Sequence, residues 1–123
     1  MIDKIGEISL EIINLLNLGI PAGTPIYIGE SNRRHMKSRH PRDYEKYYTR
    51  LSKIISEPDY AGINPSDGSI EIIKEFGKYI KVAVRIANDG EYYARSLYEI
   101  NSKRVANFVK DGMLFPVDKK KNS

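Results

Sequence analysis

The only two histidines of the chain, His35 and His40, lie five residues apart in a cationic stretch at 31–41. Imidazole changes its charge near neutral pH, so a histidine can take up or release a proton during a reaction. Arginine and lysine hold phosphate oxygens through charge-assisted hydrogen bonds. Together these side chains predict chemistry on a phosphodiester rather than a role in a protein core.

Cleavage of RNA by such side chains needs a base for the 2′-hydroxyl proton, an acid for the leaving 5′-oxygen and cations for the charge that develops on the phosphate. This route requires no metal. Side chains of the necessary types occur in the cationic stretch and in the C-terminal half of the chain. They are His35, His40, Lys74, Lys81, Arg85, Arg95, Ser96 and Tyr98.

Metal or cofactor chemistry has little support in the sequence. The chain has no cysteine, which excludes a thiolate nucleophile, a disulfide framework and a thiolate metal site. Two histidines with four residues between them do not form a zinc signature, and the chain has neither a His-Glu-x-x-His motif nor a glycine-rich phosphate loop. We therefore expect no metal and no other cofactor.

Positive charge is concentrated in one part of the chain. Residues 31–53 carry eight cations and two anions, a net charge of +6, whereas the whole chain carries +4. A basic patch on a mildly acidic body favours a polyanion such as RNA that docks at one place. A solvated basic helix face without a partner is the alternative that charge alone leaves open.

The candidates also have purely structural interpretations. His40 could cap a helix, and His35 could be a half-buried histidine whose hydrogen bonds are satisfied. Arg95 could form an ion pair with Glu71 or Glu99. Lysines on predicted strands are more often solvated than catalytic.

The cationic stretch should fold as two helices. Ser31 is a suitable N-cap for a helix that runs to about Arg39. Pro41 biases His40 away from helical dihedral angles, so a second helix should begin at Pro41 or Arg42. On one continuous helix, residues five apart lie about 140° apart around the axis. The break therefore decides whether the two histidines can converge.

The second helix is predicted to continue to about residue 55. Tyrosine and aliphatic residues recur there at helical spacing, and the opposite face is cationic. A tyrosine stripe of this kind is more often core than a platform for base stacking. Other helices are predicted at 10–18, capped by Ser9 and followed by Gly19, and at 102–110, capped by Ser102.

A change to period two after Ser69 predicts strands at 69–76, 78–87 and 91–100, with a hairpin turn at 88–90. Shorter strands are predicted at 4–8, 26–28 and 113–117. Helices followed by an antiparallel sheet indicate an α+β fold. We expect one domain at 1–118 and a disordered basic tail at 119–123.

The turn of the hairpin decides which side chains share a face of the sheet. A two-residue turn brings Lys81, Arg85, Ser96 and Tyr98 to one polar face, whereas a three-residue turn brings Arg95 there instead. The cross-strand pairs for the two-residue turn are Lys81–Tyr98, Ala83–Ser96 and Arg85–Ala94.

No signal peptide and no apolar run of membrane-spanning length is visible in the sequence. We therefore expect a cytoplasmic protein without a membrane partner.

A series of short runs, in this order, resembles the phage-associated nuclease domains of the Barnase–EndoU–colicin–RelE (BECR) group. The matches extend from about Gly6 to Leu114. The runs are IYIGESN (26–32), HM (35–36), HP (40–41), PDYAG (58–62), GSIE (68–71), KEF (74–76), VAVR (82–85), ARSLY (94–98) and NF (107–108).

The resemblance implies a small metal-independent ribonuclease. Its N-terminal helices would pack on one side of a curved antiparallel sheet, and the open face of the sheet would hold the catalytic groups. Such domains are toxins or effectors, either free-standing with an antitoxin or immunity protein, or fused to phage structural proteins. Ser96 stands where the resemblance suggests threonine, and the hydroxyl is kept.

The sequence therefore predicts an endoribonuclease that leaves 2′,3′-cyclic phosphate ends. A non-catalytic module that binds nucleic acid or protein through the same patch, and an enzyme acting on a small phosphorylated molecule, are the alternatives. The predicted catalytic residues, among which Lys74 is selected by the resemblance alone, are His35, His40, Lys74, Arg85, Arg95, Ser96 and Tyr98. The predicted RNA-binding residues are Arg33, Arg34, Lys37, Arg39, Arg42, Lys46, Arg50 and Lys81.

Overall fold

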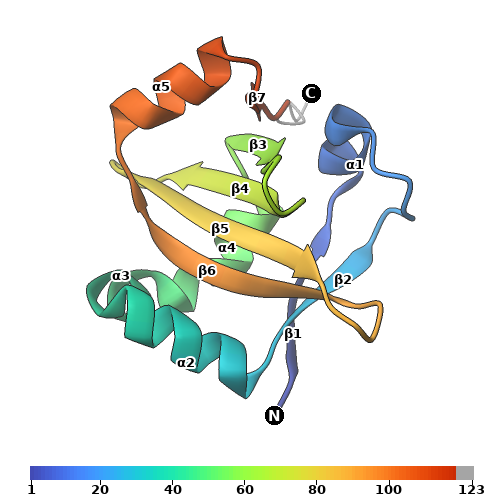
Figure 1. Ribbon diagram of the computed structural model, residues 1–123, viewed down its shortest axis with the longest axis vertical. Coiled ribbons are helices and arrows are strands. Elements are labelled where there is room, and N and C mark those ends of the chain that lie inside the picture. The colour runs from blue at the N-terminus through green and yellow to red at the C-terminus, as the bar shows by residue number, and fades with distance from the viewer. Residues whose placement is uncertain (119–123) are drawn as a thin grey trace, which may run out of the picture.

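The strands of the protein form one seven-stranded sheet within residues 1–118, the part of the chain that the computed structural model describes (Figure 1). The spatial order is β1-β2-β6-β5-β4-β3-β7. All neighbouring pairs are antiparallel except β2 and β6, which are parallel. The strands are β1 (Asp3–Ile8), β2 (Thr24–Ile28), β3 (Tyr60–Ile63), β4 (Ile70–Glu75), β5 (Tyr79–Ile86), β6 (Tyr92–Ile100) and β7 (Leu114–Pro116).

Most helices precede the long strands in the chain, and the predicted α+β class is confirmed. The tail predicted at 119–123 lies outside the described residues. No helix within 1–118 is long and apolar enough to cross a membrane. The helices are α1 (Leu10–Leu16), α2 (Glu30–Arg39), α3 (Pro41–Tyr47), the 3-10 turn η1 (Tyr48–Arg50), α4 (Leu51–Ser56) and α5 (Ser102–Lys110).

One face of the sheet carries the main core. Ile80, Val82 and Val84 alternate along β5 and are fully buried. They belong to the same apolar cluster as Ile54 and Ile55 of α4, and Figure 1 shows α4 behind β5 and β6. Burial of this continuous apolar surface is the main force that holds α4 against the sheet.

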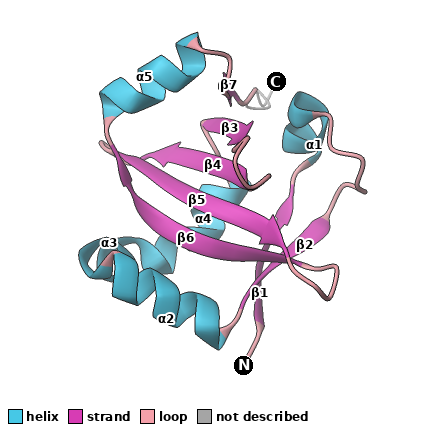
Figure 2. Ribbon diagram, in the orientation of Figure 1, coloured by secondary structure: helices cyan, strands magenta, loops and turns pink. Residues whose placement is uncertain are grey.

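The opposite face is covered only in part. Ile73 and Ile100 form a smaller cluster there with Val105 of α5. Figure 2 shows α5 above the band of middle strands and α2 with α3 below it, next to β6. The polar side chains that alternate with the main core along β5 and β6 lie on this second face.

The outer edge of β6 is completed by helices in place of a strand. β2 pairs with β6 only at Tyr92 and Tyr93. Farther along, the Asp43 carboxylate of α3 accepts a hydrogen bond from the backbone N–H of Glu99 at 3.0 Å. The Tyr47 hydroxyl donates to the Glu99 carboxylate at 2.8 Å. The Asp43 bond satisfies one backbone N–H of the strand edge, and the two bonds together fix α3 beside β6.

The predicted break between the two helices is confirmed. His40 ends α2 and precedes α3 with φ −140° and ψ 70°, outside the helical region, as expected for a residue before proline. The predicted cap at Ser31 is wrong, because the N-cap of α2 is Gly29, two residues earlier, and the helix begins at Glu30. The Asn32 side chain accepts the Gly29 N–H at 2.8 Å and so satisfies this helix end.

The predicted second helix is not continuous. α3 ends at Tyr47, and η1 separates it from α4. Tyr47 itself is buried in the main core, as the tyrosine stripe predicts, while Tyr44 and Tyr48 pack against that core. The 3-10 turn keeps nearly the same apolar spacing as an α-helix, so the periodicity could not reveal it.

Other helix ends also differ from the prediction. The Ser9 hydroxyl caps α1 as expected, with Ile12 N–H at 3.2 Å. The helix ends before Gly19, because Asn17 adopts the left-handed conformation with φ 54°. Asn101, rather than Ser102, caps α5 through a 2.7 Å hydrogen bond from the Lys103 N–H.

Strand β3 was not predicted. It contains Gly62, which is buried beside β7. A Cβ at this position would lie 2.1 Å from the Met113 carbonyl oxygen. Only glycine allows the backbones to approach so closely, which extends the sheet by β3 and β7.

Candidate active site

The β5–β6 hairpin contains both of the predicted registers. Its loop is Asn88-Asp89-Gly90, with Gly90 at φ 82°. Near the loop, Arg85 pairs with Tyr93, so the predicted pair with Ala94 is wrong. Beyond the shift in register between residues 83 and 84, the predicted pairs Ala83–Ser96 and Lys81–Tyr98 are confirmed.

A β-bulge at Arg95 joins the two registers. Val84 pairs with Ala94 and Ala83 pairs with Ser96, so Arg95 is the extra residue of β6. Arg95 is exposed. The bulge therefore adds an arginine beside Ser96 while Leu97 returns to the buried face.

Both histidines lie against the second half of β6. They line a hollow of about 300 Å³, which we call the histidine hollow. Helix α2 and the α2–α3 junction form one wall, and β6 forms the other. The lining residues are His35, Met36, Arg39, His40, Ser96 and Tyr98.

His40 is held in place within this hollow. Its ring stacks on the Tyr98 ring, with centroids 4.6 Å apart and an angle of 23° between the planes. Its backbone N–H donates to the Met36 carbonyl at 3.0 Å. The helix break at Pro41 thus directs the second histidine toward the sheet, whereas His35 stays exposed on α2.

A nearly buried cation lies behind Tyr98. Lys81 is 7% exposed, and its ammonium group donates to the Glu71 carboxylate at 2.9 Å. The same group lies 5.0 Å from the centroid of the Tyr98 ring. Burial lowers the pKa of Lys81, but its interactions with Tyr98 and Glu71 outweigh burial and raise the pKa above the ordinary value. Lys81 is therefore a positively charged group that is paired with Glu71 and held behind Tyr98, one of the residues that line the histidine hollow.

A second and larger depression continues from His35 toward the β5–β6 loop. This hairpin groove has a volume of about 840 Å³, and Arg34, Tyr93 and Arg95 are among its lining residues. Because His35 lines both spaces, the two form one path along α2. The groove adds two exposed arginines to that path.

Arg85 lies on the same face of the sheet as Lys81, opposite Tyr93. Arg85 is half-buried and lines neither the histidine hollow nor the hairpin groove. The structure thus brings Arg85 to the edge of the site, one cross-strand pair from the groove.

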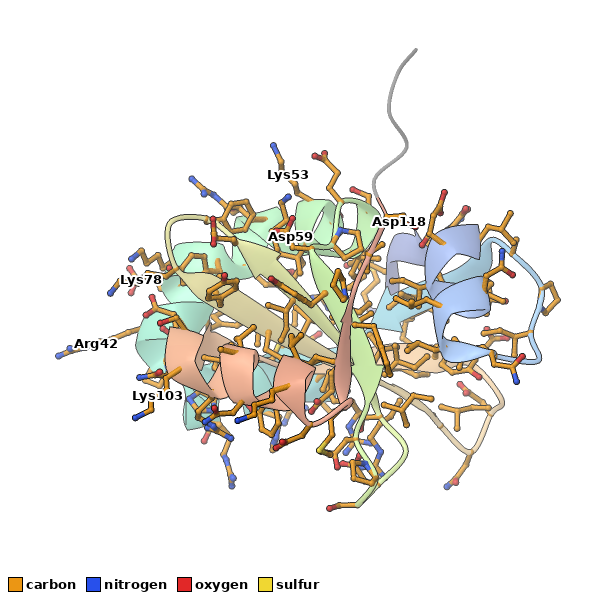
Figure 3. All side chains as sticks on the ribbon, turned by 90° about the horizontal axis from the view of Figure 1, so that it is seen from above. Arg42, Lys53, Asp59, Lys78, Lys103 and Asp118 are labelled. Atoms are coloured by element: carbon orange, nitrogen blue, oxygen red, sulfur yellow. The ribbon has the colours of Figure 1, made fainter. Side chains whose placement is uncertain are left out.

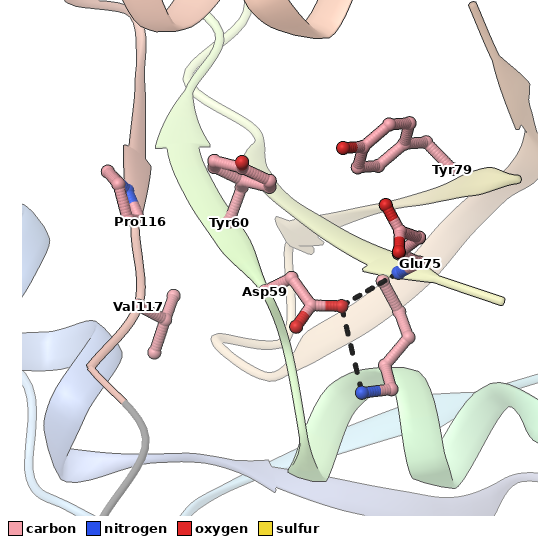
Figure 4. A pocket seen from close by; sticks show the side chains of 7 residues that line it. Asp59, Tyr60, Glu75, Tyr79, Pro116 and Val117 are labelled. Atoms are coloured by element: carbon pink, nitrogen blue, oxygen red, sulfur yellow. Dashed lines mark hydrogen bonds and ion pairs between the residues drawn. The ribbon is translucent and has the colours of Figure 1, made fainter. Parts of the chain in front are cut away.

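Lys74 lies apart from the histidines. It pairs with Ile80, so its side chain is on the main-core face of the sheet. Its ammonium group is 3.7 Å from the Asp59 carboxylate, and it lines a separate space of about 360 Å³, the Lys74 hollow (Figure 4). Figure 4 also shows Tyr60 and Tyr79 at this hollow.

The predicted RNA-binding residues have different surroundings. Arg33 holds the N-terminal strand, because it donates to the Tyr48 hydroxyl at 2.8 Å and pairs with Asp3. Lys46 lies 3.7 Å from Glu99. The exposed members are Arg34, Lys37, Arg39, Arg42, Lys46 and Arg50.

Sequence reasoning missed the role of Glu71. The sequence suggests Glu71 only as an ion-pair partner of Arg95, whereas in the structure its carboxylate holds Lys81. Asn64 also donates to it, at 3.4 Å. The signal was present in the alternation of β4, because Ile70 and Ile72 are core residues and Glu71 must therefore face the other way.

Metal-binding side chains do not gather in the part of the chain that is described. No group of three or more histidine, aspartate or glutamate side chains is close enough there to hold an ion. The chemistry that the site offers is proton transfer by imidazole next to fixed and exposed cations.

The chain matches the model of a known nuclease family. The model of the family described as phage-Barnase-EndoU-ColicinE5/D-RelE like nuclease3 matches residues 3–107. No curated protein matches the chain. No solved structure matches it either.

Proposed function

The chain belongs to the phage-Barnase-EndoU-ColicinE5/D-RelE like nuclease3 family, and on this basis we propose that it is a metal-independent endoribonuclease. Membership of a nuclease family supports an enzyme that acts on nucleic acid. The observation that carries the finer proposal is the histidine hollow, where His35 and His40 share one space with the Ser96 and Tyr98 side chains.

In the proposed reaction, one histidine removes the proton from a 2′-hydroxyl, and the resulting oxygen attacks the adjacent phosphorus. The other histidine donates a proton to the 5′-oxygen as its bond to phosphorus breaks. The products are a 2′,3′-cyclic phosphate and a free 5′-hydroxyl. Imidazole suits both roles because its pKa lies near the working pH.

The cations have a separate role. The phosphate gains negative charge in the transition state, and positive charges that are already oriented stabilise it at low reorganisation cost. Lys81 is oriented by Glu71 and Tyr98. Arg39 and Arg95 line the histidine hollow and the hairpin groove, respectively, where exposed guanidinium groups can bind phosphate oxygens.

The experiment is a digest of a defined RNA oligonucleotide in the presence of EDTA. We expect cleavage, with 2′,3′-cyclic phosphate and 5′-hydroxyl ends identified by mass spectrometry. A matching oligonucleotide with a 2′-deoxyribose at the cut position should resist cleavage there. Intact RNA, or cleavage that stops in EDTA, would overturn the proposal.

We further propose that the protein is a toxin or phage-associated effector that acts on cytoplasmic RNA. The family name and the exposed arginines that line the histidine hollow and the hairpin groove support this biological role. An antitoxin or immunity protein that covers the histidine hollow is the expected partner. Induction of the wild-type protein in a bacterial host should stop growth, and induction of His40→Ala should be tolerated.

A further inference from the structure

A second cationic space lies outside the histidine hollow. It has a volume of about 480 Å³, and we call it the cationic hollow. Lys46 comes from α3, Arg50 from η1 and Lys78 from the turn between β4 and β5, so three separate segments each contribute one cation. The remaining lining residues are Tyr47, Phe76 and Gly77.

Aromatic rings support two of these cations. The Tyr47 and Phe76 rings are stacked, with centroids 6.4 Å apart and planes at 10°. The Arg50 guanidinium carbon lies 5.0 Å from the Phe76 centroid, and the Lys46 nitrogen lies 5.2 Å from the Tyr47 centroid. Cation–π contacts restrict both side chains, which reduces the entropy lost when a ligand binds.

The turn between β4 and β5 requires glycine. Gly77 has φ 81°, and a Cβ there would meet no atom within 4 Å. Its role is therefore conformational rather than steric. Phe76 N–H donates to the Lys78 carbonyl at 2.8 Å across this turn, which places both residues at the rim of the hollow.

One carboxylate holds the two lysines without neutralising the site. Lys46 and Lys78 are each 3.7 Å from Glu99, beyond hydrogen-bond distance, and their side chains are 61% and 67% exposed. The hydrogen bond from Tyr47 lowers the pKa of Glu99 and keeps the carboxylate ionised. Three cations thus face one anion, and their N–H groups remain able to bind an added ligand.

We propose that the cationic hollow binds a phosphate group of the RNA strand at a distance from the cleaved bond. This inference rests on the proposed function, since it extends the path of the same substrate. Arg50 would hold two phosphate oxygens with its planar fork, and the two lysines would add point charges.

The hollow is placed so that one strand can reach both sites. His40 is the residue before α3 and Lys46 lies in its last turn, six residues later, which corresponds to about 9 Å along the helix axis. Glu99, which holds the lysines, directly follows Tyr98 on β6, so the two side chains lie on opposite faces of the sheet, on either side of the β6 edge that α3 covers. Figure 3 shows Arg42 and Lys78 projecting from the same end of the molecule. A strand leaving the histidine hollow along α3 would therefore meet the cationic hollow.

The test uses a fluorescent 2′-O-methyl RNA oligonucleotide, which binds but cannot undergo 2′-hydroxyl attack. We expect the double variant Arg50→Ala/Lys78→Ala to bind it about tenfold or more weakly, measured by fluorescence anisotropy. The slope of log affinity against log salt should become shallower by about 0.7 for each lost phosphate contact. Circular dichroism and thermal unfolding check that each variant is folded.

The matched control is Lys53→Ala/Lys110→Ala, which removes the same charge from two exposed lysines that line none of the spaces described above. Equal binding by the two double variants would overturn the inference, because the effect would then be one of net charge. Gly77→Ala provides a second variant that keeps every cation and should weaken binding by distorting the turn.

Competition distinguishes a strand from a free ion. Inorganic phosphate should displace the oligonucleotide only at concentrations far above those of an unlabelled competitor strand. Displacement at equal phosphate-group concentration would overturn the proposal in favour of a free-phosphate site. Because the probe cannot be cleaved, binding that depends on Arg50 and Lys78 by a protein that cuts no RNA would refute the proposed function while supporting the hollow.

Discussion

Within residues 1–118, two nearly buried lysines lie on adjacent strands, and only one of these two lies beside the histidines. Lys81 is 7% exposed and 2.9 Å from Glu71, and Lys74 is 8% exposed and 3.7 Å from Asp59. Each lysine pairs with a carboxylate, and the two lysines are buried to nearly the same extent. They differ in the face of the sheet on which they lie.

The alternation of side chains between the two faces of the sheet explains the difference. Lys81 faces the partly covered side, where it contacts the Tyr98 ring below His40. Lys74 pairs with Ile80 and faces the main core, 5.9 Å from the Phe76 ring. A shift of one residue moves a side chain to the other face of a sheet, so the same residue type can serve catalysis or structure.

The largest expected effect concerns His40. His40→Ala removes a proton-transfer group and should lower kcat by about 10²–10⁴-fold. Single-turnover cleavage of a labelled RNA oligonucleotide measures this effect. His40→Asn is the control for lost packing on Tyr98, and recovery of activity in this variant would place His40 in a purely structural role.

Lys81 should have the next largest effect. Lys81→Met keeps the length of the side chain but removes the fixed charge, and it should lower kcat by about 10²-fold with a smaller change in KM. Steady-state kinetics on the same oligonucleotide provide the measurement. A change in KM alone would mean that Lys81 only binds RNA.

Glu71 should act through Lys81. Glu71→Gln retains a hydrogen-bond acceptor but removes the charge that orients the ammonium group, so kcat should fall less than in Lys81→Met. In the double variant with Lys81→Met, the two effects should not add, because both remove the same interaction. Fully additive losses of kcat would show that Glu71 and Lys81 act independently.

The pH dependence of stability should report the interactions that Lys81 makes in the folded state. The interactions with Tyr98 and Glu71 outweigh burial and raise the pKa of Lys81 above 10.5, so the charged form is favoured by folding. The corresponding stability is present below that pH and is lost as the pH rises through the higher pKa of the folded state. As the pH is raised above 10.5, the free energy of unfolding measured with urea should fall less for Lys81→Met than for the wild type.

Lys74 should have the smallest effect on cleavage. Lys74→Met removes the ion pair with Asp59 and should lower the free energy of unfolding by about 1–3 kcal/mol. Cleavage measured well below the unfolding temperature should be little changed. A loss of kcat comparable to that of Lys81→Met would remove the distinction between the two lysines.

Local patterns in the sequence predicted the long strands, the α+β class and the break at His40. Alternation along β5 reports which side chains are buried, and a proline restricts the residue before it, so both features can be inferred without the fold. Strand β3 could not be inferred in this way, because it depends on the close approach of Gly62 to Met113.

The candidate site was predicted in its residue types but not in its grouping. A bulge at Arg95 depends on how two strands pair, and neither the two-residue nor the three-residue turn describes it alone. The resemblance to a nuclease family selected Lys74, whereas tertiary structure groups Lys81 with the histidines. Such groupings depend on strand register and tertiary packing, which cannot be inferred from the sequence of one strand alone.

The pH dependence of kcat/KM for RNA cleavage in EDTA tests the central claim most directly. We expect a bell-shaped profile for the wild type, because one histidine must be neutral and the other protonated. His40→Ala should lose one limb of the bell and His35→Ala the other. A profile that keeps both limbs in either variant would contradict catalysis in the histidine hollow.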